Sequence, residues 1–153
     1  MLKTQLLHGE ILAILGRSGH GSKVLVADGN FPFLTTLGPH ARLVPLNLSP
    51  GVVSCTQVLQ ALVSVIPVEA AAVMQVADSG PYAMGEDPPV WSEYRRILRN
   101  SGWQGELEPV ERFAFYELAA GREVALTVAT ADQRLYANLM LTIGVVKPEQ
   151  AEA

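Results

Sequence analysis

Residues 16–32 read Gly-Arg-Ser-Gly-His-Gly-Ser-Lys-Val-Leu-Val-Ala-Asp-Gly-Asn-Phe-Pro. Within this stretch, residues 24–27 form an unbroken apolar run, which is typical of a strand buried on both faces in a largely parallel sheet. Asp28 follows the run directly, before two turn-forming residues. Ligands of open α/β sheets bind beyond the carboxyl ends of the strands, so Asp28 lies where a polar ligand could be held. His20 enters the same strand from its other end, and the two side chains need not share a site within one chain.

Helical and strand patterns alternate along the rest of the chain. Helical spacing of apolar residues and stop signals predict helices near residues 7–15, 54–66, 88–101 and 112–120. Short apolar or β-branched runs predict further strands at 42–44, 70–76, 124–129 and 138–143. The alternation predicts a single α/β domain over residues 1–148, built as a three-layer α/β/α sandwich around a mostly parallel or mixed sheet. We expect residues 149–153 to form a disordered tail.

Two helix starts carry local signals. Ser54 and Gln57 have the spacing of a capping box, in which a hydroxyl and an amide satisfy the first free backbone N–H groups. Asp87 can cap the next helix, with the following prolines opening it. The segments 29–41 and 78–89 are rich in Gly and Pro and are predicted to be loops.

Composition excludes several classes of protein. The 153 residues carry a formal charge of −4, and the few basic residues are scattered, which argues against nucleic-acid binding. Cys55 is the single cysteine, which fits a reducing compartment and predicts a cytoplasmic protein with a packed thiol. The apolar run over residues 52–77 is divided by Pro67 and Glu69 into pieces too short to span a bilayer, so we expect no membrane association.

Motifs for three common chemistries do not fit. The glycines at 16, 19 and 21 follow a predicted helix and precede a strand, the reverse of the context of a dinucleotide-binding fingerprint. The three histidines share no metal-ligand spacing, so no metal site is predicted. The chain has no Gly-x-Ser-x-Gly elbow for a serine nucleophile.

Polar residues at the ends of predicted elements remain as candidates, each with a plainer interpretation. His20 lies between two glycines and should be reachable for acid/base chemistry, or it is simply a surface residue. Asp28 could hold a ligand or cap a turn. Arg112 could bind a ligand or pair with neighbouring Glu111 or Glu108. Tyr116 could belong to the core with its hydroxyl at the edge.

Tyr136 and Asn138 are two positions apart just before an apolar strand, so their side chains should project to the same side. From the residues alone, the chain is an α/β domain with one polar cluster of undecided role.

Five segments in this order resemble the D-ribose pyranase / L-fucose mutarotase family, and most closely its fucose branch: Gly19-His20-Gly21, Asp28-x-x-Phe31-Pro32, Gly38-Pro39, Arg112-Phe-Ala-Phe-Tyr-Glu117 and Tyr136-x-Asn138. The resemblance extends to about Pro148. It implies a cofactor-independent isomerase of carbohydrate metabolism, in which a monosaccharide such as L-fucose exchanges its anomers by ring opening. It also implies a ring-shaped homo-oligomer with active sites between neighbouring subunits.

The resemblance assigns roles to individual residues. It implies that His20 is the proton donor and that Tyr116 also takes part in catalysis. The substrate-binding positions that it implies are Asp28, Glu69, Arg112, Tyr136 and Asn138. Two positions depart from the family pattern: Asn30 replaces a second histidine, and Glu69 stands where some fucose mutarotases have aspartate. These departures bear on which sugar is bound more than on the chemistry.

Two alternative functions fit the same sequence. The first is an oligomeric sugar-binding protein without turnover, which the loss of a histidine at Asn30 and the altered segment 78–89 would favour. The second is a subunit whose apolar surface serves mainly in assembly.

Overall fold

The structure is a computed structural model, and it describes residues 1–148; the predicted tail over 149–153 lies outside the described residues. The elements follow the predicted order with one addition. They are α1 (Gly9–Leu15), β1 (Lys23–Ala27), β2 (Arg42–Pro45), α2 (Cys55–Leu62), β3 (Val68–Met74), α3 (Pro89–Asn100), β4 (Leu107–Val110), α4 (Arg112–Ala119), β5 (Val124–Ala129) and β6 (Leu139–Ile143).

All six strands of the described residues join one sheet in the order β2-β5-β1-β6-β3-β4. β1 pairs parallel with β5, β5 with β2, and β3 with β4. β6 runs antiparallel to both of its neighbours, β1 and β3. The predicted mixed sheet is therefore confirmed, and its single reversed strand lies in the middle.

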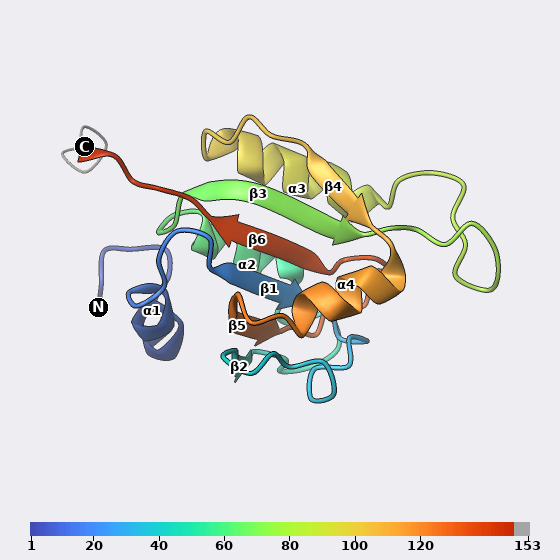
Figure 1. Cartoon of the computed structure of the whole chain (residues 1–153), viewed down its shortest axis with the longest axis horizontal. Helices are drawn as coiled ribbons and strands as arrows, with labels where there is room; N and C mark the ends of the chain where they lie inside the picture. Colours follow the sequence, from blue (N-terminus) through green and yellow to red (C-terminus); the bar gives the residue numbers. More distant parts are fainter. Residues whose placement is uncertain (149–153) are drawn as a thin grey trace.

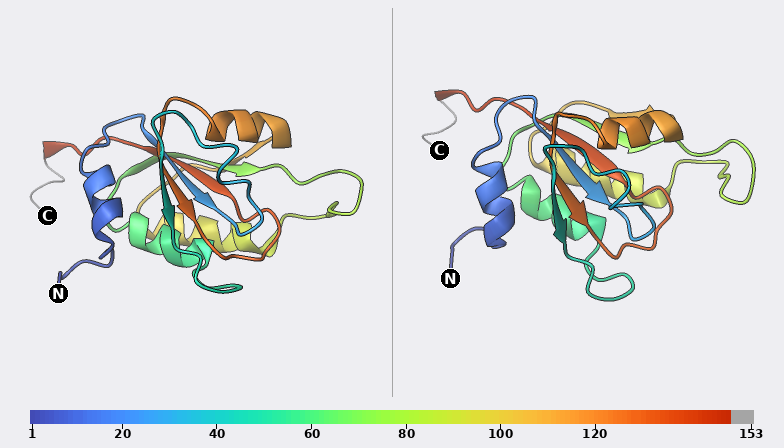
Figure 2. Two further views of the ribbon diagram at one scale, coloured as in Figure 1. Left: turned by 90° about the horizontal axis from the view of Figure 1, so that it is seen from below. Right: turned by 60° about the horizontal axis from the view of Figure 1, so that its bottom comes forward.

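Helices cover both faces of the sheet, as the three-layer prediction requires (Figures 1 and 2). α2 and α3 pack on one face, and α4 alone packs on the other. α1 contributes Ile11 and Leu15 to the same apolar cluster as α2 and α3. In Figure 1, α4 lies over the ends of the strands nearest the long β3–α3 segment, and the opposite half of this face carries no helix.

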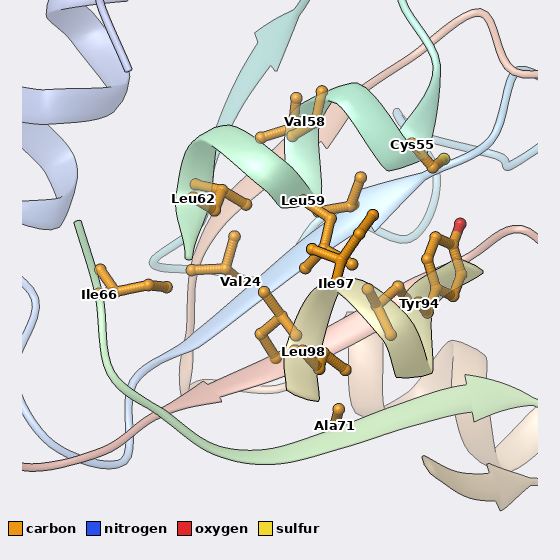
Figure 3. Close-up of a cluster of buried hydrophobic side chains, with 14 of the residues drawn as sticks. Val24, Cys55, Val58, Leu59, Leu62, Ile66, Ala71, Tyr94, Ile97 and Leu98 are labelled. Atoms are coloured by element: carbon orange, nitrogen blue, oxygen red, sulfur yellow. The ribbon is translucent and has the colours of Figure 1, made fainter. Parts of the chain in front are cut away.

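The larger core lies between the sheet and the α2–α3 layer (Figure 3). Leu59, Leu62 and Leu98 are fully buried there against Val24 of β1. The Ser54 capping box is formed: its hydroxyl accepts from the Gln57 N–H, and the Gln57 side chain accepts from the Ser54 N–H. A local sequence signal therefore fixes where α2 begins, and its apolar face then buries against the sheet.

Three local predictions are corrected. β4 was not predicted, because Glu108 and Pro109 interrupt its apolar pattern; a proline is tolerated there because β4 lies at the edge of the sheet. Pro45 belongs to β2, the other edge strand, for the same reason. Asp87 does not cap α3: Pro88 occupies the cap position, and the Asp87 carboxylate pairs instead with Arg95 at 2.8 Å.

Candidate active site

The polar candidates gather at one edge of the sheet. Asp28 follows β1, Arg112 follows β4, and the segment after β3 turns away at the same edge. Because β6 is reversed, the residues that precede it, including Asn138, reach this edge as well. The carboxyl ends of parallel strands form the usual ligand crevice of an open α/β sheet, and one antiparallel strand adds its amino end to it.

Asp28 and Asn138 hold one another by reciprocal hydrogen bonds. The Asp28 backbone N–H donates to Asn138 Oδ1 at 2.8 Å, and Asn138 Nδ2 donates to Asp28 Oδ2 at 2.9 Å. Asp28 Oδ1 accepts from the Asn30 N–H at 2.9 Å. Both side chains are buried, and burial raises the pKa of Asp28 from 3.8 to about 6 despite the hydrogen bond from Asn30. Asp28 also forms a turn, as its alternative interpretation expects, because its side chain accepts from the backbone N–H of Asn30, two residues later.

Arg112 and Tyr116 form a second pair, one turn apart on α4. Arg112 Nε donates to the Tyr116 hydroxyl at 3.2 Å, and the hydrogen bond raises the pKa of Arg112. Its guanidinium also lies 5.6 Å from the centre of the Tyr116 ring. The alternative interpretation, an ion pair of Arg112 with Glu111 or Glu108, is not formed within residues 1–148. The Glu111 carboxylate instead caps α4 by accepting from the N–H groups of Phe113 and Ala114.

Arg112 stands at the first position of α4, where a positive charge is unfavourable because the helix dipole is positive there. Its side chain is exposed, although it contacts Tyr116. A charged residue that breaks a local helix rule at the mouth of a pocket is a candidate for function.

Tyr136 lies in the left-handed region of backbone conformation, with φ of 59°. Its hydroxyl accepts from the Ala77 N–H at 3.1 Å and donates to the Tyr82 carbonyl at 2.6 Å. Tyr136 and Asn138 both line the same pocket, which agrees with the prediction that they project to one side.

These side chains line one pocket of about 800 Å³. Its floor and walls include Asp28, Asn138, Arg112, Tyr116 and Tyr136, and the segment after β3 closes a further side with Asp78, Ser79, Pro81 and Tyr82. Sequence reasoning missed this second wall: the run of turn formers at 78–81 predicts a loop but carries no signal of where the loop lies. Phe113 also lines the pocket and is exposed, which adds an apolar rim.

Among the described residues, the lining of this pocket includes neither His20 nor Glu69. These two side chains meet one another instead, with His20 Nε2 2.5 Å from Glu69 Oε2. Both are about half exposed. Gly21, with φ of 81°, supplies the turn that leads from His20 into β1, and its N–H donates to the Ile143 carbonyl at the end of β6. β1 lies between His20 and Asp28, and its five residues alone span roughly 16 Å at about 3.3 Å per residue.

Residues 1–146 match the RbsD / FucU transport protein family. The chain belongs to this family. It is 36% identical over 146 residues to a fucose mutarotase of Homo sapiens and 34% identical over 145 residues to one of Danio rerio; each alignment covers 92% of this chain and 90% of the relative. The resemblance that the sequence motifs indicated is therefore confirmed.

The crystal structure of the fucose mutarotase from Streptococcus pneumoniae in complex with L-fucose has the same fold. The two structures superpose with a TM-score of 0.80 at 24% sequence identity. The alignment covers 96% of this chain and all of the Streptococcus pneumoniae chain. The predicted α/β architecture is confirmed by this likeness. Within residues 1–148, no helix is both long enough and apolar enough to cross a bilayer.

Proposed function

We propose that the chain is a monosaccharide mutarotase, a cofactor-independent isomerase that interconverts the anomers of L-fucose or a closely related sugar, with each active site shared by two copies. The homologues named fucose mutarotase, aligned over more than nine-tenths of the chain, support the reaction. The observation that carries the shared site is that the polar pocket and the His20–Glu69 pair lie at opposite ends of one strand.

The pocket offers hydrogen-bonding groups suited to a sugar. Asp28 still has free lone pairs, although each of its carboxylate oxygens already accepts one hydrogen bond. Arg112 has donors that its bond to Tyr116 does not use, and the Tyr116 hydroxyl can still donate its proton. Carboxylates and guanidinium groups can bind vicinal hydroxyls in pairs, so these residues would fix the orientation of the ring. The Tyr136 ring and the apolar rim would contact its carbon face.

His20 is proposed as the group that moves the proton. A carboxylate only accepts, so the Glu69 contact keeps a proton on Nε2 and leaves Nδ1 to face the sugar. Nδ1 can donate when the ring is charged and accept when it is neutral. We therefore assign Glu69 to the orientation of His20 rather than to direct contact with the sugar. We assign Tyr116 to proton transfer from the pocket, on the side of the sugar that faces away from His20.

The reaction needs only proton transfer. The anomeric hydroxyl loses its proton, the bond between C1 and the ring oxygen breaks, and the ring oxygen gains a proton. The open-chain aldehyde then rotates about its C1–C2 bond, and the same steps in reverse close the ring as the other anomer. Positioned acid/base groups contribute about 10²–10⁴ each, which suffices for a reaction that sugars undergo unaided in water.

A second copy would bring its His20 to the open side of the pocket, and repetition of that contact around an axis would form a closed ring. The half of the sheet face that α4 leaves uncovered lies at the end where β1 begins (Figure 1), and His20 precedes β1 at that end; this half offers a surface for the contact. The exposed Ala70 at the start of β3 and the partly exposed Thr142 of β6 belong to it. We place the activity in the cytoplasm, where the buried Cys55 would stay reduced.

The first experiment is saturation-difference NMR of anomer exchange with L-fucose, ribose, galactose and rhamnose. We expect accelerated exchange with at least one sugar, lost in His20→Ala and retained in His40→Ala, which removes another exposed histidine. Wild-type exchange in a folded His20→Ala protein would refute the role of His20. Binding by calorimetry with exchange at the buffer rate would identify a non-catalytic sugar-binding protein. If no sugar binds at all, the remaining alternative is a subunit that serves mainly in assembly.

The shared site has a sharper test. His20→Ala and Arg112→Ala should each be inactive alone, but co-expressed at equal amounts they should form mixed rings in which about a quarter of the sites combine a native pocket with a native histidine. If mixing restores no activity, or if light scattering finds a monomer, the shared site is wrong.

A further inference from the structure

The segment between β3 and α3 forms one wall of the pocket. Figures 1 and 2 show it extending away from the sheet edge. It turns back on itself at Gly80, whose carbonyl accepts from the Ala83 N–H, and Ala77 pairs with Ala83 as an isolated bridge. Its residues 78–83 are exposed. We refer to residues 77–83 as the pocket loop.

One atom makes every hydrogen bond that joins the pocket loop to the rest of residues 1–148. Between Gln75, whose N–H donates to Val110, and Asp87, which pairs with Arg95, the hydrogen bonds to the remainder of the described chain all involve the Tyr136 hydroxyl. This hydroxyl joins the two ends of the loop. It accepts from the Ala77 N–H where the loop begins and donates to the Tyr82 carbonyl where the loop returns.

Tyr136 is itself fixed from two directions. Its carbonyl accepts from Trp91 Nε1 of α3 at 3.0 Å, and the next carbonyl, that of Ala137, accepts from the buried Tyr94 hydroxyl at 2.5 Å. Asn138 is locked to Asp28 at the end of β1. The phenol ring therefore projects from a segment tied to both α3 and the central strand, which makes it a firm anchor for the pocket loop.

The hydrogen-bonding capacity of the Tyr136 hydroxyl limits how it can bind a sugar. A phenol has one proton to donate and two lone pairs. The proton goes to the Tyr82 carbonyl and one lone pair takes the Ala77 N–H, so the hydroxyl cannot donate to a sugar without releasing the loop.

We infer that Tyr136 is a positioning residue: its hydroxyl fastens the pocket loop in place, in the free protein and with ligand bound, and it acts on the sugar through the wall that it holds. The fastening of the loop stands on the hydrogen bonds alone, whereas its effect on a sugar rests on the proposed function. The resemblance implies a substrate-binding role for Tyr136 without saying which part of the side chain makes the contact; on this inference the ring makes it, and the hydroxyl stays on the loop.

Hydrogen exchange followed by mass spectrometry tests the fastening without any sugar. In Tyr136→Phe, the peptide that contains Ala77 should exchange roughly 5- to 30-fold faster, the factor for the loss of one or two hydrogen bonds of about 1 kcal/mol each. Peptides from β1 and α2 should be unchanged. Tyr116→Phe is the matched control, because its hydroxyl lines the same pocket but does not touch the loop, and it should leave loop exchange at the wild-type rate. Equal loop exchange in Tyr136→Phe and wild type would overturn the inference.

A measurement on the wild-type protein decides the matter even if Tyr136→Phe folds poorly. Saturation with L-fucose should keep or increase the protection of the Ala77 amide, because the hydroxyl stays on the loop. Faster exchange of this amide in the complex would mean that the hydroxyl leaves the loop for the sugar, which contradicts the inference. A protein that binds no sugar would refute the proposed function and leave the sugar-free comparison of the two tyrosine variants to decide the role of Tyr136.

Discussion

Asp28 should make the folded protein less stable as the pH rises, whereas most aspartates make it more stable, and Asp28→Asn should remove this dependence. Burial raises the pKa of Asp28 from 3.8 to about 6, so between these values the folded protein binds a proton that the unfolded chain has lost. The free energy of unfolding that Asp28 contributes therefore falls as pH rises from about 4 to about 6 and is constant above that range. At about 1.4 kcal/mol per tenfold change in proton affinity, the fall amounts to about 3 kcal/mol.

The assay is urea unfolding of the wild type and Asp28→Asn at several pH values between 4 and 7, at one fixed protein concentration because association adds to apparent stability. The asparagine cannot accept both hydrogen bonds that the carboxylate receives from Asn30 and Asn138, so the variant will differ from the wild type at every pH. The decisive quantity is how that difference changes: the wild type should lose about 2 to 3 kcal/mol relative to the variant between pH 4 and pH 7, because a part of the full effect lies below pH 4.

Asp132→Asn is the control, because Asp132 has a lowered pKa and its contribution to stability should change with pH in the opposite direction. Burial alone would raise the pKa of Asp132, but hydrogen bonds from Arg134 and the Cys55 N–H outweigh it and hold the pKa below 3.8. Its contribution to stability is therefore present above pH 4 and lost as the pH falls further. A wild-type-to-Asp28→Asn difference that stays constant with pH, or that grows as the pH rises, would refute the reasoning about the buried carboxyl.

Three further changes test other parts of the structure. Ser54→Ala removes the capping box of α2 and should lower the free energy of unfolding by about 1 kcal/mol in chemical denaturation; an unchanged midpoint would contradict the capping role. Cys55 should not react with a thiol reagent until the protein unfolds, because burial raises the pKa of its thiol to about 12; rapid labelling of the native protein would show that the thiol is accessible. Arg112→Lys keeps the charge but loses the planar donors, so the affinity for the sugar should fall roughly tenfold or more by calorimetry with the fold intact, and unchanged affinity would remove Arg112 from the site.

Local signals made much of the fold predictable. The apolar run at 24–27 and the capping box at Ser54 depend on residues close in sequence, and both predictions are confirmed. β4 could not be predicted, because its pairing with β3 outweighs the poor strand propensity of Pro109 at an edge position.

The site was predictable only in part, and for a related reason. Asp28 could be located because it ends a recognisable strand, but its partner Asn138 lies 110 positions away. The contacts of Tyr136 with the pocket loop and of His20 with Glu69 span 54 to 59 and 49 positions. No periodicity or spacing rule reaches across such separations, so the family resemblance could name these residues but not show which of them meet.

The reversed direction of β6 has a practical consequence. Because this strand begins at the pocket and ends beside Gly21, a reporter group attached just after Ile143 would lie at the edge that carries His20. If copies associate as proposed, a fluorophore there would respond to the docking of a neighbouring copy and remain insensitive to what fills its own protomer's pocket. The two events could then be followed separately in one molecule.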